Sequence, residues 1–188
     1  GTVYGAGFCD HFRVVHKRAS DKHQRDEFRR SKYVQSDMED IFRRVREDLK
    51  TGIPVLFTGT PCQTAGLRSY IDGKLAENLY LADIICHGTP SPAVWDSYLS
   101  WHEDLAGEKA KNVIFRDKAF GWRISRETIE FEDRNVSSRS YNHLFYQNIM
   151  MRESCGVCPF ASVYRPSDLT MADYWRKDKA CPDFASDN

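Results

Sequence analysis

Two short apolar runs, each followed closely by a cysteine, constrain the fold of this 188-residue chain more than any other feature. The runs cover residues 53–58 and 79–85, and Cys62 and Cys86 come just after them. Continuous apolar runs of this length are typical of strands that are buried on both faces of a parallel sheet. One helix fits in the segment between the runs, so together they predict a βαβ unit with a right-handed crossover.

Signals for a helix start follow the first run. Thr60 and Gln63 have capping-box spacing, and Pro61 occupies the first helical position, where proline is favoured. Cys62 therefore falls in the first turn of a helix, where the helix dipole favours a thiolate. Ser91 and the proline after it give the same start signal behind the second run. Because open α/β sheets bind ligands at the carboxyl ends of their strands, we expect a site at this edge.

The periodicity of the rest of the chain predicts the remaining elements. Ser36 and Glu39 have capping-box spacing before an amphipathic run, so a helix is expected to begin at Ser36. After Gly107 the apolar period changes to two, which is typical of strands with one solvated face. The other expected elements are strands over residues 2–8, 112–116, 122–131 and 168–174 and a helix over residues 141–151. These elements predict the α/β class: a mixed sheet with a parallel βαβ core, additional antiparallel strands, and helices packed on the sheet.

Composition limits the class of function. The 27 basic and 27 acidic residues balance, so no net charge attracts nucleic acid or an anionic membrane surface. No apolar run is long enough to span a bilayer and no export leader is present, which predicts a cytoplasmic protein without membrane insertion. Only 41% of the residues are hydrophobic, which is low for a complete enzyme. We therefore expect residues 1–188 to form a single α/β domain that is the central fragment of a longer chain.

The cysteines are the strongest chemical signal. Cys155 and Cys158 form a C-x-x-C pair, whose loop can direct both sulfurs toward the two strand-end cysteines. In a reducing compartment, thiols more often bind metals or carry out redox chemistry than form disulfides. Four thiolates suit either zinc or an iron–sulfur cluster, and the dispersed spacing favours the cluster, with zinc and buried or redox-paired thiols as alternatives. Cys9 and Cys181 are expected to be buried and without a metal partner.

Five stretches of sequence carry a family resemblance. They are SKYVQSD (31–37), VLFTGTPCQTAGL (55–67), DIICHGTPSPAVWDSYL (83–99), FRDKAFGW (115–122) and SCGVCPFASVYRPSDLTMADYW (154–175). In this order and over nearly the whole chain, they resemble the coenzyme F-420 hydrogenase/dehydrogenase beta-subunit family. The resemblance implies a family N-terminal part over about residues 1–50, a cluster-binding part over about residues 51–176, and a poorly ordered end over residues 177–188. It also implies a fragment that lacks the family's N-terminal ferredoxin-like segment and its C-terminal end.

The resemblance implies an iron–sulfur flavoprotein oxidoreductase. A flavin, FAD, would exchange a hydride with a deazaflavin-like or other small acceptor or donor, and a 4Fe-4S cluster would pass single electrons. Many bacterial members belong to organisms without the deazaflavin, so the acceptor is open, and a ferredoxin-like domain or other redox protein is the expected partner. The implied cluster ligands are Cys62, Cys86, Cys155 and Cys158. The expected flavin contacts are Lys32, Tyr33, Gln35 and Ser36.

Two further expectations complete the site. The turn formed by Thr58, Gly59 and Thr60 has backbone N–H groups at a helix start, a place suited to the cofactor's phosphates. Asp173 is expected to pair with Arg165 or Arg116. No protein nucleophile is expected, because the cofactors carry the chemistry. The alternative function is a non-enzymatic zinc-stabilised or protein-interaction domain that uses the same four thiolates structurally.

Overall fold

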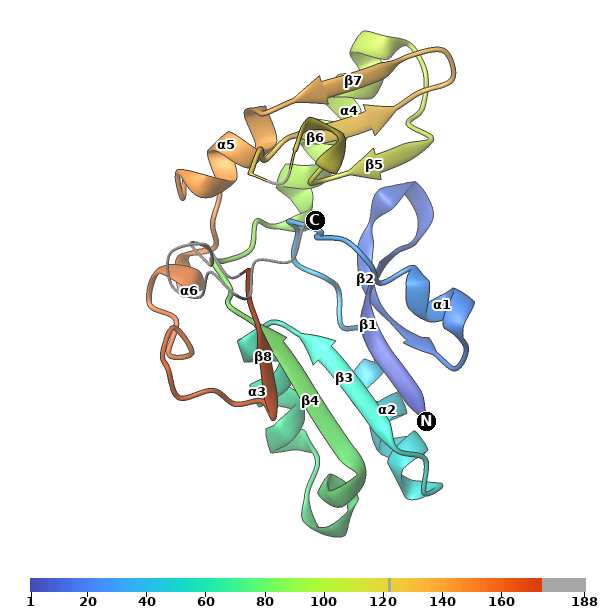
Figure 1. The fold of residues 1–188 in the computed structure, drawn as a ribbon, viewed down its shortest axis with the longest axis vertical. Helices are drawn as coiled ribbons and strands as arrows, with labels where there is room; N and C mark the ends of the chain where they lie inside the picture. Colours follow the sequence, from blue (N-terminus) through green and yellow to red (C-terminus); the bar gives the residue numbers. More distant parts are fainter. Residues whose placement is uncertain (122, 174–188) are drawn as a thin grey trace, which may run out of the picture.

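The computed structural model describes residues 1–121 and 123–173, which form two sheets with helices around them (Figure 1). The expectation for residues 177–188 therefore lies outside the described residues. The larger sheet has five strands in the order β2-β1-β3-β4-β8, and the smaller sheet has three in the order β5-β6-β7. The strands are β1 (Thr2–Phe8), β2 (Val14–Ala19), β3 (Val55–Gly59), β4 (Leu79–Ile84), β5 (Asn112–Ile114), β6 (Glu127–Glu130), β7 (Asn135–Ser138) and β8 (Leu169–Met171).

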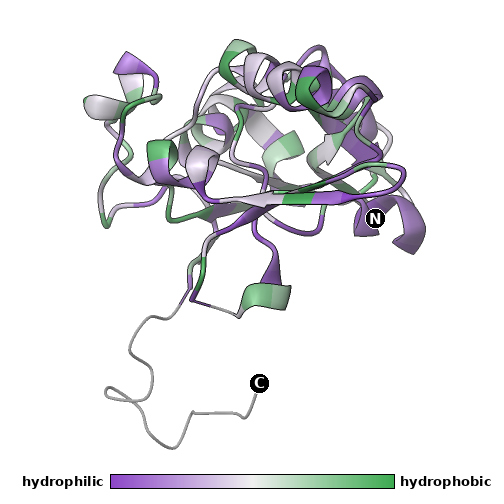
Figure 2. Cartoon of the chain, turned by 90° about the horizontal axis from the view of Figure 1, so that it is seen from above, coloured by the Kyte–Doolittle hydropathy of each residue, from purple (hydrophilic) through white to green (hydrophobic). Residues whose placement is uncertain are grey.

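The helices connect and cover these strands. The α-helices are α1 (Lys22–Asp26), α2 (Ile41–Lys50), α3 (Pro61–Tyr70), α4 (Pro92–Ala106), α5 (Ser140–Tyr146) and α6 (Glu153–Gly156). Short 3-10 turns cover Asp10–Phe12, Gly73–Asn78 and Lys118–Phe120. Hydrophobic and hydrophilic segments lie side by side on the helices (Figure 2), as expected for helices with one buried face. In the described part of the chain, no helix is long and apolar enough to cross a membrane.

The five-stranded sheet confirms the predicted α/β class. Strands β1, β3, β4 and β8 run parallel, and β2 pairs antiparallel with β1 at one edge. The two apolar runs form the neighbouring strands β3 and β4, joined through α3, as the βαβ prediction required. The register pairs Gly59 with Asp83 and Asp83 with Thr170. The carboxyl ends of three strands therefore meet at one edge of the sheet.

One face of this sheet carries the first hydrophobic core. Helices α2 and α3 pack there and lie behind the sheet in Figure 1. Tyr4, Phe57 and Leu81 point from successive strands into this core and are almost fully buried. Their neighbours on the opposite face are more open: Leu56 is 38% exposed and Tyr80 is 54% exposed. The alternation along β3 and β4 thus separates a helix-covered face from an uncovered one.

The predicted start of the second helix is wrong. Helix α2 begins at Ile41 with Asp40 as its N-cap residue, and Glu39 has a positive φ of 39°. The Ser36 hydroxyl, which was expected to cap this helix, is buried and bonded to His16 and Gln63 instead. These tertiary hydrogen bonds outweigh the local capping pattern.

The three-stranded sheet holds the second core. The alternating segment after Gly107 forms strands β5 and β6, as predicted. However, β6 covers only Glu127–Glu130, and strand β7 was not predicted. The helix expected over residues 141–151 ends at Tyr146. Glu127 is 1% exposed and accepts hydrogen bonds from the Tyr141 backbone N–H and from the Asn142 side chain at 3.0 and 2.6 Å. A buried carboxylate thus fixes the N-terminus of α5 on β6.

Candidate functional site

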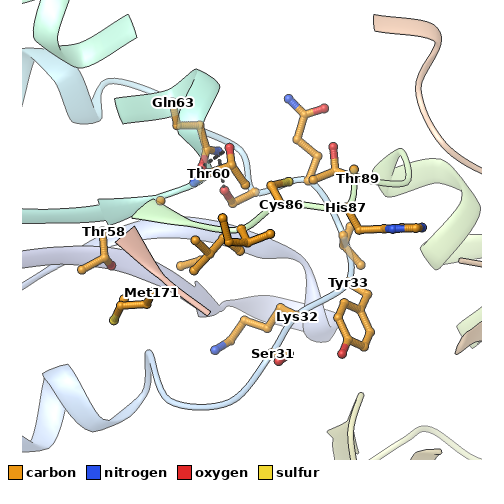
Figure 3. A pocket seen from close by; sticks show the side chains of 18 of the residues that line it. Ser31, Lys32, Tyr33, Thr58, Thr60, Gln63, Cys86, His87, Thr89 and Met171 are labelled. Carbon is orange, nitrogen blue, oxygen red and sulfur yellow. Dashed lines mark hydrogen bonds between the residues drawn. The ribbon is translucent and has the colours of Figure 1, made fainter. Parts of the chain in front are cut away.

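A cleft of about 750 Å³ lies at the carboxyl ends of β3, β4 and β8, at the edge where the sequence predicted a site. Its walls come from the loop before α2, the turn after β3, the segment after β4, and α5. Figure 3 shows labelled side chains from the first three of these segments around it. The cleft is lined by all seven expected flavin-contact residues and by two of the four expected ligands: Lys32, Tyr33, Gln35, Ser36, Thr58, Gly59, Thr60, Cys62 and Cys86. Cys155 and Cys158 are not among its lining residues.

The turn after β3 has the predicted helix start. Thr60 and Gln63 form the capping box, with the Thr60 backbone N–H donating to Gln63 Oε1 at 3.0 Å. A Cβ on Gly59 would lie 3.0 Å from both Gln63 Oε1 and a ring carbon of Phe57, so the close packing leaves no room for a side chain. The Thr58 hydroxyl donates to the Tyr4 carbonyl at 3.1 Å. Of this turn, mainly backbone and the Thr60 side chain remain to meet a ligand.

Lys32 supplies a partly buried positive charge on the opposite wall. Its ammonium donates to the carbonyls of Phe28, Arg29 and Arg30 at 3.3, 3.0 and 3.3 Å, so neutral backbone oxygens hold it. Burial lowers the pKa of Lys32 to about 8, and the charge of Lys17 adds to this effect. An anionic group placed in the cleft would relieve this cost, since opposite charge stabilises the ammonium form.

Gln35 joins the cleft to the segment that carries the C-x-x-C pair. Its side-chain oxygen accepts a hydrogen bond from Arg152 Nη1, and its backbone N–H donates to the Pro90 carbonyl at 3.1 Å. Arg152 in turn donates its backbone N–H to the Thr89 carbonyl at 3.3 Å. Direct hydrogen bonds therefore hold together the loop of the expected flavin contacts and the segment that carries the C-x-x-C pair.

An aromatic rim closes the cleft on the side of the smaller sheet. Tyr33 stacks on Phe145 with ring centroids 4.6 Å apart, and its hydroxyl lies 3.3 Å from that of Tyr146. His87 packs against both rings of α5, at 5.1 and 5.7 Å. The sequence did not predict Phe145 and Tyr146 as site residues, because their local pattern does not indicate that α5 packs against the loop before α2.

His16 is a second residue that sequence reasoning missed. It is 3% exposed on β2, with Nε2 lying 3.0 Å from the Thr58 carbonyl oxygen and Nδ1 lying 2.8 Å from Ser36 Oγ. Its ring stacks on Phe57 at 5.0 Å. Burial lowers the pKa of His16 to about 4, although the bond to Thr58 opposes the shift. His16 is therefore neutral near pH 7.

Two ion pairs border the cleft. Arg116 Nη1 donates to Asp173 Oδ2 at 2.7 Å, which confirms one of the two predicted pairings of Asp173. Arg165 pairs instead with Asp83, at 3.1 Å. Arg165 also donates to the carbonyls of Phe160, in the loop after the C-x-x-C pair, and of Ile84 on β4, at 2.9 and 2.8 Å. One guanidinium therefore fastens this loop to the strand that leads to Cys86.

The four expected cluster ligands are free thiols from three segments. Cys62 lies in the first turn of α3, Cys86 follows β4, and Cys155 lies in α6. Burial raises the pKa of Cys86 to about 11, and charge repulsion from Cys62, Cys155 and Cys158 contributes to the rise. Cys155 is also close to the segment after β4, since its sulfur lies 4.0 Å from the Thr89 hydroxyl. The four thiols thus share one neighbourhood.

This neighbourhood does not have the geometry of a closed metal site. Among residues 1–121 and 123–173, no three or more His, Cys, Asp or Glu side chains are arranged to hold one metal ion. The chemistry of the donors still fits a soft metal or an iron–sulfur cluster, because such sites bind cysteine thiolates and these four thiols are free. The ligand set therefore stays a prediction.

Comparisons with known proteins agree with this picture. A family model for the C-terminal region of the coenzyme F420 hydrogenase/dehydrogenase beta subunit matches residues 54–184. A chain in a structure of the F420-reducing NiFe hydrogenase complex from Methanosarcina barkeri, derivatised with xenon, matches with a TM-score of 0.54 and 16% identity. The match covers 84% of this chain and 53% of that chain, so this chain spans about half the length of its structural relative, and the likeness shows a shared fold. A comparison with curated proteins gave no match.

Proposed function

Because the chain belongs to the coenzyme F420 hydrogenase/dehydrogenase beta-subunit family, we propose that it is an oxidoreductase module that moves electrons between a flavin and an iron–sulfur cluster. The flavin, FAD, occupies the cleft, and the ligands of a 4Fe-4S cluster are Cys62, Cys86, Cys155 and Cys158. The observation that carries the proposal is the shared cleft, since the expected flavin-contact segments and two of the four thiols line one cavity. When bound, the flavin supplies hydride chemistry and the cluster supplies single-electron transfer.

The residues of the cleft fit a large, flat, anionic cofactor. Its volume of about 750 Å³ is in the range of ligand pockets. Tyr33 and Phe145 present aromatic surface, and Lys32 presents a positive charge whose hydrogen-bond partners among the described residues include no carboxylate. The backbone of the turn at Gly59 lies at the start of α3, a ten-residue helix whose N-terminus favours negative charge. In this proposal Lys32 balances anionic charge on the ligand, and the turn receives phosphate oxygens.

The thiols fit a cluster for a separate reason. They belong to segments that hydrogen bonds already hold together, through Gln35 and Arg152 on one side and Arg165 on the other. The cleft and the thiols meet at Cys62 and Cys86, so electrons need to cross only a short distance between the two cofactors. A small molecule that donates or accepts a hydride, and a redox partner protein of ferredoxin-like type, complete the proposed electron path.

Iron and flavin analysis of protein reconstituted without oxygen tests the proposal. We expect about four irons per chain, broad absorption near roughly 400 nm, and FAD that co-purifies on gel filtration. Cys62→Ser and Cys158→Ser are expected to lose the iron, whereas Cys9→Ser, whose sulfur bonds to Arg13 away from the cleft, keeps it. Full iron content in the Cys62 and Cys158 variants would overturn the ligand set. One zinc per chain together with no affinity for FAD would instead show the structural zinc domain.

A further inference from the structure

A continuous chain of hydrogen bonds runs from the buried ring of His16 to the sulfur of Cys62. Ser36 Oγ lies 2.8 Å from His16 Nδ1 and 2.8 Å from Gln63 Nε2. Thr60 Oγ1 lies 3.1 Å from Gln63 Oε1 and 3.2 Å from Cys62 Sγ. The chain joins β2, the loop before α2 and the first turn of α3. His16 is 3% exposed and Ser36 is 6% exposed, so the first link is shielded from water.

His16 fixes the direction of the hydrogen bonds from its own ring as far as the Gln63 amide. The carbonyl of Thr58 can only accept, so His16 Nε2 carries the proton, and Nδ1 of the neutral ring accepts from the Ser36 hydroxyl. The Ser36 oxygen then accepts from the Gln63 amide nitrogen. This orients Gln63 Oε1 toward Thr60, where it accepts from the backbone N–H at 3.0 Å and from the hydroxyl. A flipped Gln63 amide would lose two hydrogen bonds: the one that its nitrogen donates to Ser36 and the one that its oxygen accepts from the Thr60 backbone N–H.

The Thr60 hydroxyl therefore stands between two acceptors. Gln63 Oε1 keeps the bond from the Thr60 backbone N–H whichever way the hydroxyl points. The hydroxyl is thus available to donate to the Cys62 sulfur when that sulfur carries negative charge, without leaving Gln63 unsatisfied. Cys62 itself is exposed in the first turn of α3, where the helix dipole also favours negative charge on its sulfur.

We propose that Thr60 is a positioning residue that donates a hydrogen bond to the Cys62 sulfur, and that His16, Ser36 and Gln63 hold Thr60 in place. The inference builds on the proposed role of Cys62 as a cluster ligand. It gives Ser36 and Thr60 a role in orienting this sulfur in addition to lining the cleft. Hydrogen bonds to ligating sulfurs are among the factors that set the reduction potential of such centres.

The first test uses reduced, metal-free protein and iodoacetamide, with alkylation of each cysteine followed by peptide mass spectrometry. Thr60→Val is expected to slow the alkylation of Cys62 by about fivefold, because the hydroxyl stabilises the thiolate, which is the form of Cys62 that attacks the reagent. Thr60→Ser, which keeps the hydroxyl, is expected to retain the original rate. Thr128→Val is the matched control, since it removes a threonine hydroxyl that also donates a hydrogen bond but lies in the other sheet, on β6.

A double-mutant cycle tests whether the hydrogen bonds from His16 to Cys62 act together. Ser36→Ala is expected to slow the alkylation of Cys62 in the original protein and to have no further effect in the Thr60→Val background. Gln63→Met takes the place of Ser36→Ala if the latter does not fold. Additive effects of the two substitutions, or an unchanged rate in Thr60→Val, would overturn the inference.

A second test uses the iron-loaded protein. Thr60→Val is expected to keep its iron and to show a lower reduction potential than the original protein, and Thr60→Ser is expected to restore that potential. An unchanged potential at full iron content would count against the inference. The two proposals can fail separately, because the alkylation cycle needs no metal. A protein that takes up no iron but shows the non-additive cycle refutes the proposed cluster and supports the hydrogen-bond chain.

Discussion

Arg165 Nη2 lies 3.1 Å from Oδ1 of Asp83, a carboxylate with no exposed surface. Neither oxygen of Asp83 has a hydrogen-bond partner within the described residues, so this ion pair is what compensates the buried charge. Arg165 also donates to the carbonyls of Phe160, in the loop after the C-x-x-C pair, and of Ile84, on the strand that leads to Cys86. The same guanidinium therefore neutralises Asp83 at the sheet edge and holds the loop after the C-x-x-C pair in position.

Arg165→Met is expected to destabilise the fold by about 3 kcal/mol, because it leaves Asp83 buried without a counter-charge. Urea denaturation of the purified chain measures the effect. The double variant Asp83→Asn with Arg165→Met should recover part of the loss, since it removes the unpaired charge. A free energy of unfolding for Arg165→Met equal to that of the original protein would show that the pair contributes nothing.

The neutral state of His16 predicts a dependence of stability on pH. In the unfolded chain His16 takes up a proton near its ordinary pKa of 6.5, whereas burial keeps it unprotonated in the folded chain down to about pH 4. The unfolded state therefore binds more protons in this window, and stability falls as pH drops from 6.5 to 4, by up to roughly 3 kcal/mol.

His16→Asn is expected to flatten that part of the pH profile, because asparagine does not titrate. Denaturation curves at several pH values between 7 and 4 provide the measurement. His23→Asn, at an exposed position on α1, serves as the control and should leave the slope unchanged. Equal slopes in the original protein and His16→Asn would contradict the prediction.

Lys32→Met is expected to weaken FAD binding by about tenfold at pH 7, because it removes a charged donor from the wall of the cleft. Burial holds the pKa of Lys32 at about 8 in the free protein, so the advantage of the original protein should shrink as the pH rises through that value. Fluorescence titration of FAD at pH 7 and pH 9 tests both statements. Lys32→Arg, which keeps the charge, should show no such loss. If Lys32→Met bound FAD at pH 7 as tightly as the original protein does, Lys32 would not contribute to FAD binding.

Gly59→Ala is expected to destabilise the protein by about 1–3 kcal/mol, because the new methyl group would press on Gln63 and Phe57. It should also slow the alkylation of Cys62, since Gln63 holds Thr60. Gly156→Ala is the matched control, because among the described residues nothing beyond its own helix backbone and chain neighbours lies within 4 Å of the position that its Cβ would take. Thermal unfolding of the two variants side by side gives the comparison.

The predictions from the sequence were most accurate where an element depends only on residues close to it in the sequence. The apolar runs that became β3 and β4, and the capping box that starts α3, depend on neighbours a few positions away, and each was predicted correctly. Their position at the sheet edge follows from parallel topology alone, which is why Cys62 and Cys86 could be placed at the cleft beforehand.

Predictions that depended on tertiary contacts were less reliable. Ser36 has a capping-box partner in the sequence, but the buried ring of His16 and the amide of Gln63 offered it stronger bonds. The α5 residues Phe145 and Tyr146 became part of the cleft only because Glu127 anchors their helix to β6. No local pattern carries that information, since it depends on how the two sheets pack.

One wall of the cleft belongs to the five-stranded sheet, and another belongs to a helix anchored on the three-stranded sheet. This division has an evolutionary consequence. Cys62, Cys86 and the turn at Gly59 lie at the edge of the five-stranded sheet, while Phe145 and Tyr146 belong to a helix that is anchored on the three-stranded sheet. Sequence drift in the smaller sheet can therefore reshape that wall of the cleft, while the residues proposed to hold the cofactors stay as they are.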